Sequence, residues 1–169
     1  MKKHYHTFAG DNAWANRRLY AAAAELSDAD YRADRGAFFK SMHGTLNHLL
    51  ATDRIWMKRF TGAGDAPDRL DAIVHEGFTE LRTAREAEDR RIVAWIDSLD
   101  DGSLAGVIHY RRVSSPDGFV QELMPALDHW FNHQTHHRGH AHMILTGLGK
   151  VAPELDLLFY QREAAAGHA

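Results

Sequence analysis

Apolar side chains recur every three or four residues along four long stretches of the chain, which is the pattern of an amphipathic helix. The four stretches cover residues 5–26, 38–60, 70–99 and 123–148. Glycine and proline separate the second stretch from the third in the segment TGAGDAP at 61–67. The pattern therefore predicts an all-α fold, an antiparallel four-helix bundle.

The apolar and charged positions of the second and third predicted helices give more specific expectations. Phe39 falls on the apolar face of the second helix, and Ile73 on that of the third. The middle of the third helix, RTAREAEDRR at 82–91, is so rich in charge that we expect it to be a solvent-exposed surface held by spaced ion pairs.

The spacing of apolar residues changes between the third and fourth predicted helices. The segment GVIHYRRVSSPDGFVQEL at 106–123 has short β-prone runs on either side of Pro116, Asp117 and Gly118. This indicates a small β-hairpin with its turn near Asp117–Gly118, carried by a long crossover connection.

Length and composition are those of one ordinary globular domain. The chain has 169 residues, of which 44% are apolar and 25% charged. We expect residues 1–163 to form a single domain and residues 164–169 to fray as a small, polar tail. The N-terminus lacks the apolar run of a signal peptide, so we expect a cytoplasmic protein without a membrane span.

Charge and cysteine content exclude several classes of function. The formal net charge is −3 with histidine neutral, which argues against a general nucleic-acid binder. A weaker hypothesis keeps DNA as a partner through a basic patch. Its members would be Arg17, Arg18, Arg111, Arg112 and Arg138. The chain has no cysteine, so a metal site must use nitrogen and oxygen ligands.

Six histidines occur within residues 129–145, HWFNHQTHHRGHAHMIL. On a helical wheel His137 lies in the centre of the apolar stripe, His133 lies one turn earlier at its edge, and His136 points toward solvent. Two imidazoles at i and i+4 can bind one divalent ion. The spacing alone also fits a core histidine satisfied by a neighbour, with the remaining histidines on the surface.

A third ligand would strengthen the metal hypothesis, and His48 is the candidate. Its face of the second helix carries Gly44, Thr45 and Thr52, small residues that leave room for an ion or a water molecule. His43 is the competitor, although it lies toward the start of the helix.

Three further polar residues lie on or near inner faces. Asn12 and Gln134 are structural contacts that fix helix register or, alternatively, contacts to metal ligands or substrate. Asp53 either orients an imidazole or pairs with Arg54 or Arg17.

Three segments together resemble the DinB/YfiT-like family of metal-dependent proteins. They are NAWANRRLYAAAAELSDADY, SMHGTLNHLLATDRIWMKRFTG and NHQTHHRGHAHMILTGLGKVAPELDLLFY, and the last is the most specific. The resemblance implies a four-helix bundle with an unusual order of helix directions, a long crossover and a homodimeric state. It also implies a metal triad formed by His48, His133 and His137, with zinc, nickel or iron as the ion. One departure is His140, where many relatives carry glutamine.

The family that the chain resembles includes enzymes that use low-molecular-weight thiols, and some hydrolase-like members. Three imidazoles leave coordination positions open, which is the layout of a catalytic site. We therefore expect a metal-dependent enzyme that acts on a small molecule. A thiol S-transferase is the preferred hypothesis, and a hydrolase is the second. The alternative is a non-catalytic metal-binding protein induced by DNA damage or stress. In that case a fourth protein ligand, from His140 or Asp53, would close the site.

Overall fold

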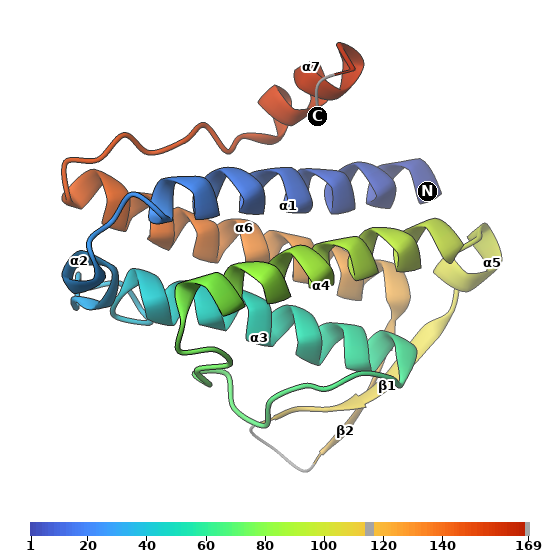
Figure 1. Cartoon of the computed structure of the whole chain (residues 1–169). Coiled ribbons are helices and arrows are strands. Elements are labelled where there is room, and N and C mark those ends of the chain that lie inside the picture. Colours follow the sequence, from blue (N-terminus) through green and yellow to red (C-terminus); the bar gives the residue numbers. More distant parts are fainter. Residues whose placement is uncertain (114–116, 168–169) are drawn as a thin grey trace.

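A computed structural model describes residues 1–113 and 117–167 (Figure 1). Within these residues there are four long helices, a two-stranded hairpin and three shorter helices. The elements are α1 (Lys2–Ala23), α2 (Asp28–Arg32), α3 (Met42–Thr61), α4 (Phe78–Ser98), α5 (Asp101–Leu104), β1 (Val107–Arg111), β2 (Gly118–Glu122), α6 (Leu123–Gly147) and α7 (Leu157–Ala165).

The long helices α1, α3, α4 and α6 form the predicted four-helix bundle (Figure 1). Helix α1 packs against α4 and α6, and α3 packs against the same two helices. The predicted antiparallel order holds for α1 with α4 and for α3 with α6. It was wrong for α3 with α4 and for α1 with α6, because each of these pairs runs in the same direction (Figure 1).

The parallel direction of α3 and α4 has a direct consequence for the connection between them. Residues 62–77 must return along the bundle before α4 can start, and this segment is an irregular run of bends and turns rather than a helix. The third helix was predicted from residue 70, but α4 begins at Phe78. Ile73, predicted on an apolar face, lies in this connection with 43% of its surface exposed.

Helix α3 is well defined at both ends, which matters because it carries His48. Its N-cap is Ser41, whose Oγ accepts a hydrogen bond from the backbone N–H of Gly44 at 3.0 Å. Its C-cap is Gly62 in the left-handed conformation, with φ of 71°.

The predicted hairpin lies between α4 and α6. Strands β1 and β2 are antiparallel, and Val107 pairs with Glu122 while Arg111 pairs with Gly118. Gly118 is therefore the first residue of β2 and not a turn residue. Pro116, around which the turn was predicted, lies outside the described residues.

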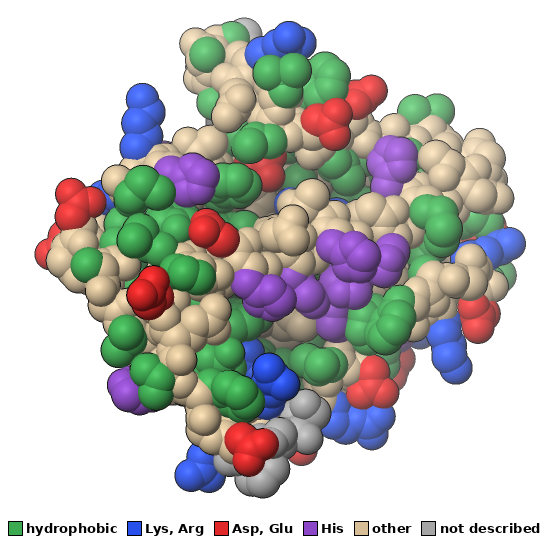
Figure 2. Space-filling model, turned by 180° about the vertical axis from the view of Figure 1, so that it is seen from behind, with side chains coloured by type: hydrophobic (Ala, Val, Ile, Leu, Met, Phe, Trp, Pro, Cys, Tyr) green, Lys and Arg blue, Asp and Glu red, His purple; other side chains and the backbone are tan. Residues whose placement is uncertain are grey.

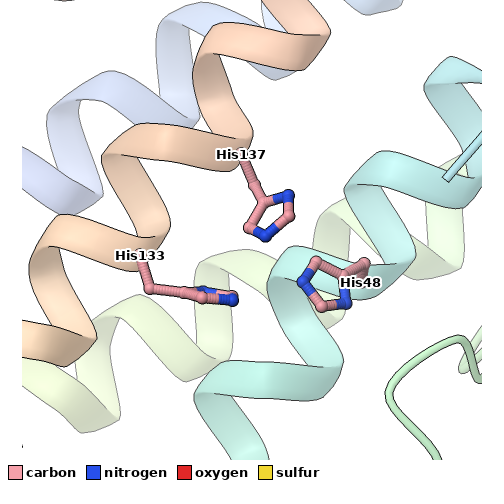
Figure 3. Close-up of side chains that lie close together, drawn as sticks. All are labelled: His48, His133 and His137. Atoms are coloured by element: carbon pink, nitrogen blue, oxygen red, sulfur yellow. The ribbon is translucent and has the colours of Figure 1, made fainter. Parts of the chain in front are cut away.

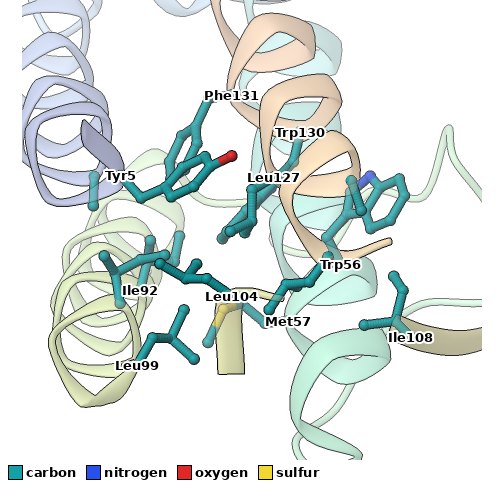
Figure 4. Packing of buried hydrophobic residues seen from close by; sticks show 14 residues of the cluster. Tyr5, Trp56, Met57, Ile92, Leu99, Leu104, Ile108, Leu127, Trp130 and Phe131 are labelled. Atoms are coloured by element: carbon teal, nitrogen blue, oxygen red, sulfur yellow. The ribbon is translucent and has the colours of Figure 1, made fainter. Parts of the chain in front are cut away.

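Two apolar clusters fill the bundle, one toward each end. One contains Tyr5, Trp130 and Phe131 (Figure 4), and the other contains Leu19, Leu46 and Ile144. Residues from all four long helices form a buried polar layer between these clusters. The residues of this buried polar layer are Asp11, Asn12, Asn16, Thr52, Asp53, Arg85, Glu88, Asp89, Gln134 and Arg138.

The prediction that residues 82–91 form a solvated surface was wrong for its inner positions. Arg85 is 1% exposed, and Glu88 and Asp89 are each 6% exposed. Arg85 is buried because it forms ion pairs with Asp53, at 2.7 Å, and with Asp89, at 2.9 Å. One of these partners, Asp53, lies on another helix, which a local pattern does not include.

Helix α7 packs on α1 and was not predicted as a helix. The Nε1–H of Trp14 donates to Glu163 at 2.7 Å, and Arg18 forms an ion pair with the same carboxylate. A Cβ on Gly10 would lie 2.0 Å from the hydroxyl oxygen of Tyr160, so this glycine permits the close approach. Helix α7 includes residues 164 and 165 of the tail predicted to fray. Residues 168–169 lie outside the described residues.

Across the part of the chain that the structure describes, no helix combines the length and the apolar character that crossing a membrane requires.

Candidate metal centre

Three imidazole rings converge between α3 and α6 (Figure 3). His48 comes from α3, and His133 and His137 come from successive turns of α6. The ring centroids lie 4.4 Å apart for His48 and His137, 4.4 Å for His133 and His137, and 5.3 Å for His48 and His133. One ligand atom from each ring lies within 4.8 Å of the other two. The structure thus brings together the three histidines selected from the sequence.

A backbone carbonyl of the long connection fixes the tautomer of His48. The Nδ1–H of His48 donates to the carbonyl oxygen of Leu70 at 2.7 Å. A carbonyl oxygen can only accept, so Nδ1 carries the proton and Nε2 keeps a free lone pair. Metal-binding histidines commonly have their second nitrogen held in this way.

The three rings are neutral at pH 7. Burial lowers the pKa of His48 to about 4. Burial and the nearby imidazole of His48 lower the pKa of His133 to about 4 and that of His137 to about 3. Neutral imidazole is the form that binds a metal ion.

Each of the three rings also has a buried nitrogen without a hydrogen-bond partner. These atoms are Nε2 of His48, Nδ1 of His133 and Nδ1 of His137. Buried polar atoms normally find a partner, so unpartnered nitrogens on three neighbouring rings need an explanation. A divalent cation supplies it, because imidazole nitrogen is a preferred ligand of zinc, nickel and iron.

Phe39 covers the ring of His48, with the two rings stacked at 3.7 Å between centroids and 19° between planes. It was predicted on the face of the second helix, but it lies before the start of α3, in a turn closed by a bridge between Ala37 and Lys40. The space expected beside Gly44 is occupied by this turn, because a Cβ there would lie 2.2 Å from the carbonyl oxygen of Phe39.

The other histidines divide into distinct environments. The Nε2–H of His43, the competing candidate, donates to the carbonyl oxygen of His75 at 3.3 Å, away from the three rings. His136 is exposed, as the helical wheel predicted. His140 lies on the next turn, with its ring 5.0 Å from that of His137 and 4.6 Å from that of His136. One ligand atom from each of His136, His137 and His140 lies within 4.8 Å of the other two, so His140 belongs to a second candidate group that shares His137 with the first.

Asn12 and Gln134 make structural contacts between helices, the first of the two alternatives. The oxygen of Asn12 accepts a hydrogen bond from Arg138. Nε2 of Gln134 donates to Oγ1 of Thr52 at 3.1 Å and to the carbonyl oxygen of Leu49 at 3.3 Å. Arg138 is 4% exposed, so it does not belong to a basic surface patch.

Asp53 belongs to the buried polar layer. It accepts a hydrogen bond from Nε1–H of Trp130 at 2.6 Å and forms an ion pair with Arg85 at 2.7 Å. Both predicted roles were therefore wrong, since it neither orients an imidazole nor pairs with Arg54 or Arg17.

A cavity of about 470 Å³ opens beside His133, which is within the size range of small-molecule sites. Residues of α3, the hairpin and α6 form its walls. Figure 2 shows that several histidine side chains gather near the centre of this face of the molecule, with a basic side chain nearby, while other histidines lie apart from them. The residues that line the cavity include Thr52, Trp56, Arg59, Leu70, Tyr110, Arg112, Gln121, His129 and His133.

These features define a helical-bundle protein with a three-histidine site beside a small-molecule cavity. The model of the DinB family matches residues 1–168, so the chain belongs to the DinB family. It is 25% identical over 157 residues to Protein DinB of Bacillus subtilis (strain 168), covering 88% of each chain. It also resembles the solved structure of YfiT from Bacillus subtilis, with a TM-score of 0.66 and 12% identity over 89% of this chain and 91% of that one. That protein is described as a probable metal-dependent hydrolase with an unusual four-helix bundle topology.

Proposed function

We propose that this chain is a metal-dependent enzyme that acts on a small molecule, with His48, His133 and His137 as the ligands of one divalent ion. The observation that carries the proposal is the convergence of three neutral imidazoles, each with an unpartnered buried nitrogen, beside a cavity. Zinc, nickel and iron all suit an all-imidazole ligand set.

The surroundings of the three rings favour a catalytic over a structural ion. Structural ions of this type are closed by four protein ligands, whereas catalytic ions have three and an open position. Of the two side chains proposed to close the site, Asp53 is paired with Arg85. The ring of His140 lies 5.0 Å from that of His137, but His140 is not part of the group formed by His48, His133 and His137. A non-catalytic, stress-induced metal-binding protein is therefore the second choice.

The roles of the chain's own residues follow from their contacts. The carbonyl of Leu70 holds the ring of His48 in one orientation, and Phe39 keeps water from one of its faces. The cavity beside His133 provides space for a substrate. When bound, a divalent ion supplies Lewis-acid chemistry that lowers the pKa of a small nucleophile.

A low-molecular-weight thiol is the proposed nucleophile, on the basis of the family resemblance. The chain has no cysteine, so the thiol must arrive as a cosubstrate. In the transfer its sulfur forms a bond to an electrophilic carbon, the leaving group departs with the electrons of its bond, and the thiol proton passes to the buffer. Hydrolysis is the second candidate, favoured by the description of YfiT.

Turnover by metal-loaded protein tests the proposal. We would combine low-molecular-weight thiols with 1-chloro-2,4-dinitrobenzene, and separately measure hydrolysis of 4-nitrophenyl esters. His48→Ala should abolish the rate, while His136→Ala, an exposed histidine on α6, should keep it. Equal rates for the wild type and His48→Ala would remove the ion from the mechanism.

The homodimer and the cytoplasmic location stay predictions from the resemblance and the N-terminal sequence. Light scattering on the purified chain measures the first, and fractionation of the source cells measures the second.

A further inference from the structure

The cavity beside His133 has a wall of uncompensated positive charge. Arg59 comes from α3, and Arg112 follows the last residue of β1. Both line the cavity, and none of the residues that line it carries a carboxylate. Within residues 1–113 and 117–167, neither guanidinium forms an ion pair. Two cations therefore face the same space without a protein counter-ion.

Aromatic rings hold the Arg59 guanidinium in place. Its Cζ lies 4.5 Å from the ring centre of Trp56 and 4.6 Å from that of Tyr110. Cation–π contacts of this kind occupy the faces of the guanidinium and leave its N–H edge available. Among the described residues its one hydrogen bond is from Nη2 to the carbonyl oxygen of Arg111, at 3.4 Å.

Arg112 is held by an aromatic ring in a similar way, and its positive charge repels that of Arg59. Its Cζ lies 4.4 Å from the ring centre of Phe119 in the paired strand. Burial lowers the pKa of Arg59; Tyr110 opposes this shift, and the positive charge of Arg112 adds to it by a smaller amount. A site that partly desolvates one cation and places a second nearby gains stability when an anion binds.

The anion would lie near the three-histidine site, because one of the three histidines, His133, lines the cavity. His133 lines the cavity together with Arg59, and the ring of His129 links them, at 5.9 Å from the ring of His133 and 5.5 Å from that of Trp56. A small molecule held by its charged end at the arginines therefore has its other end directed toward His133.

We propose that this cavity binds a small molecule with an oxyanion group, a carboxylate or a phosphate, on an apolar body. Arg59 and Arg112 bind the oxyanion group, and Trp56 and Tyr110 pack against the apolar body. The inference rests on the proposed function, because it names the substrate class of the same site. The anion contacts themselves involve no metal ligand, so they can be measured separately.

Isothermal titration calorimetry on metal-free protein tests the anion site directly. The probes are phenylacetate, phenyl phosphate and phenylacetamide, the last being a neutral isostere of the first. We expect at least one of the two anions to bind about tenfold or more tightly than the amide. Whichever anion binds more tightly identifies the oxyanion group.

Matched variants assign the effect to the two arginines. Arg59→Gln and Arg112→Gln should each weaken anion binding by about tenfold or more. Arg82→Gln removes the same charge from the exposed surface of α4, and it should leave anion binding unchanged. Because Arg59 packs between two rings, circular dichroism checks the fold of its variant, and Arg112→Gln carries the test if that variant is unfolded.

Two results would overturn the proposal: equal affinity for both anions and the amide, or an equal loss in Arg82→Gln and Arg112→Gln. Its failure is distinguishable from that of the proposed function. If metal-free wild type and His48→Ala both bind the anion while no metal-dependent turnover is found, the anion site stands and the proposed enzyme activity fails. If turnover depends on His48 but the anions bind no better than the amide, the proposed enzyme activity stands and the anion site fails.

Discussion

Replacing Arg85 by alanine tests whether the buried polar layer depends on this one cation. Arg85 is 1% exposed and connects two carboxylates, Asp53 at 2.7 Å and Asp89 at 2.9 Å. Their side chains are 0% and 7% exposed. The substitution leaves two buried carboxylates without their cation and also removes a large side chain from the middle of the bundle.

The expected loss is large for a single substitution. Removing one partner from a buried ion pair costs about 3–5 kcal/mol, because the remaining charge stays buried without compensation. For a chain of this size each kcal/mol corresponds to about 2–4 °C in Tm, so Tm should fall by about 6–20 °C.

The loss should also depend on pH. Burial raises the pKa of Asp53 to about 6, and the positive charge of Arg85 opposes this rise. Burial likewise raises the pKa of Asp89. Without Arg85 the folded state holds these protons to higher pH than the unfolded chain does, so the free energy of unfolding falls as pH rises. The deficit of Arg85→Ala relative to the wild type should therefore be smaller at pH 5 than at pH 8.

Urea and thermal unfolding of metal-free protein, followed by circular dichroism, measure both effects. The matched control is Arg82→Ala, which breaks an exposed i,i+4 pair with Glu86 on the same helix and should cost at most about 0.5 kcal/mol. If Arg85→Ala is no less stable than Arg82→Ala, or if its deficit grows toward pH 5, the reasoning about the buried carboxylates is wrong.

Two glycine substitutions test the close approaches of the backbone. Gly44→Ala should destabilise the chain by about 1–3 kcal/mol and weaken metal binding, because its Cβ would lie 2.2 Å from the carbonyl oxygen of Phe39. Gly139→Ala in α6 is the matched control: its Cβ would meet nothing within 4 Å, so it should stabilise the chain by about 0.5–1 kcal/mol. Similar urea midpoints for Gly44→Ala and Gly139→Ala would refute the prediction for Gly44. Gly10→Ala should release α7, seen as faster tryptic cleavage near Tyr160, and unchanged cleavage would contradict that contact.

The convergence of the three rings could be predicted because the face of a helix on which each histidine lies follows from residues close to it in the sequence. Helical spacing places His133 and His137 on one inner face. His48 was selected from the small residues on its face and from the family resemblance, although the space expected beside Gly44 is filled by the Phe39 turn. Once α3 packs against α6, these faces meet. The helical period therefore identified the pair on α6 without knowledge of the order of helix directions, and the complete set of three came from the family resemblance.

The features that the sequence did not predict depend on contacts between distant segments. The burial of Arg85 depends on Asp53 of another helix, so the charged run at 82–91 was interpreted as a solvated surface. The carbonyl of Leu70 reaches His48 because residues 62–77 return along the bundle. The parallel direction of α3 and α4, which requires that return, is a property of the whole chain.

The metal content of tag-free protein tests the central claim most directly. We would load the wild type, His137→Ala and His136→Ala with zinc, nickel or iron, remove loosely bound ions, and determine the bound ion by elemental analysis. His136 is the matched control, because it is the exposed neighbour of His137 on the same helix. We expect one ion per chain in the wild type and in His136→Ala, and none in His137→Ala. A full equivalent of metal retained by His137→Ala would contradict the central claim.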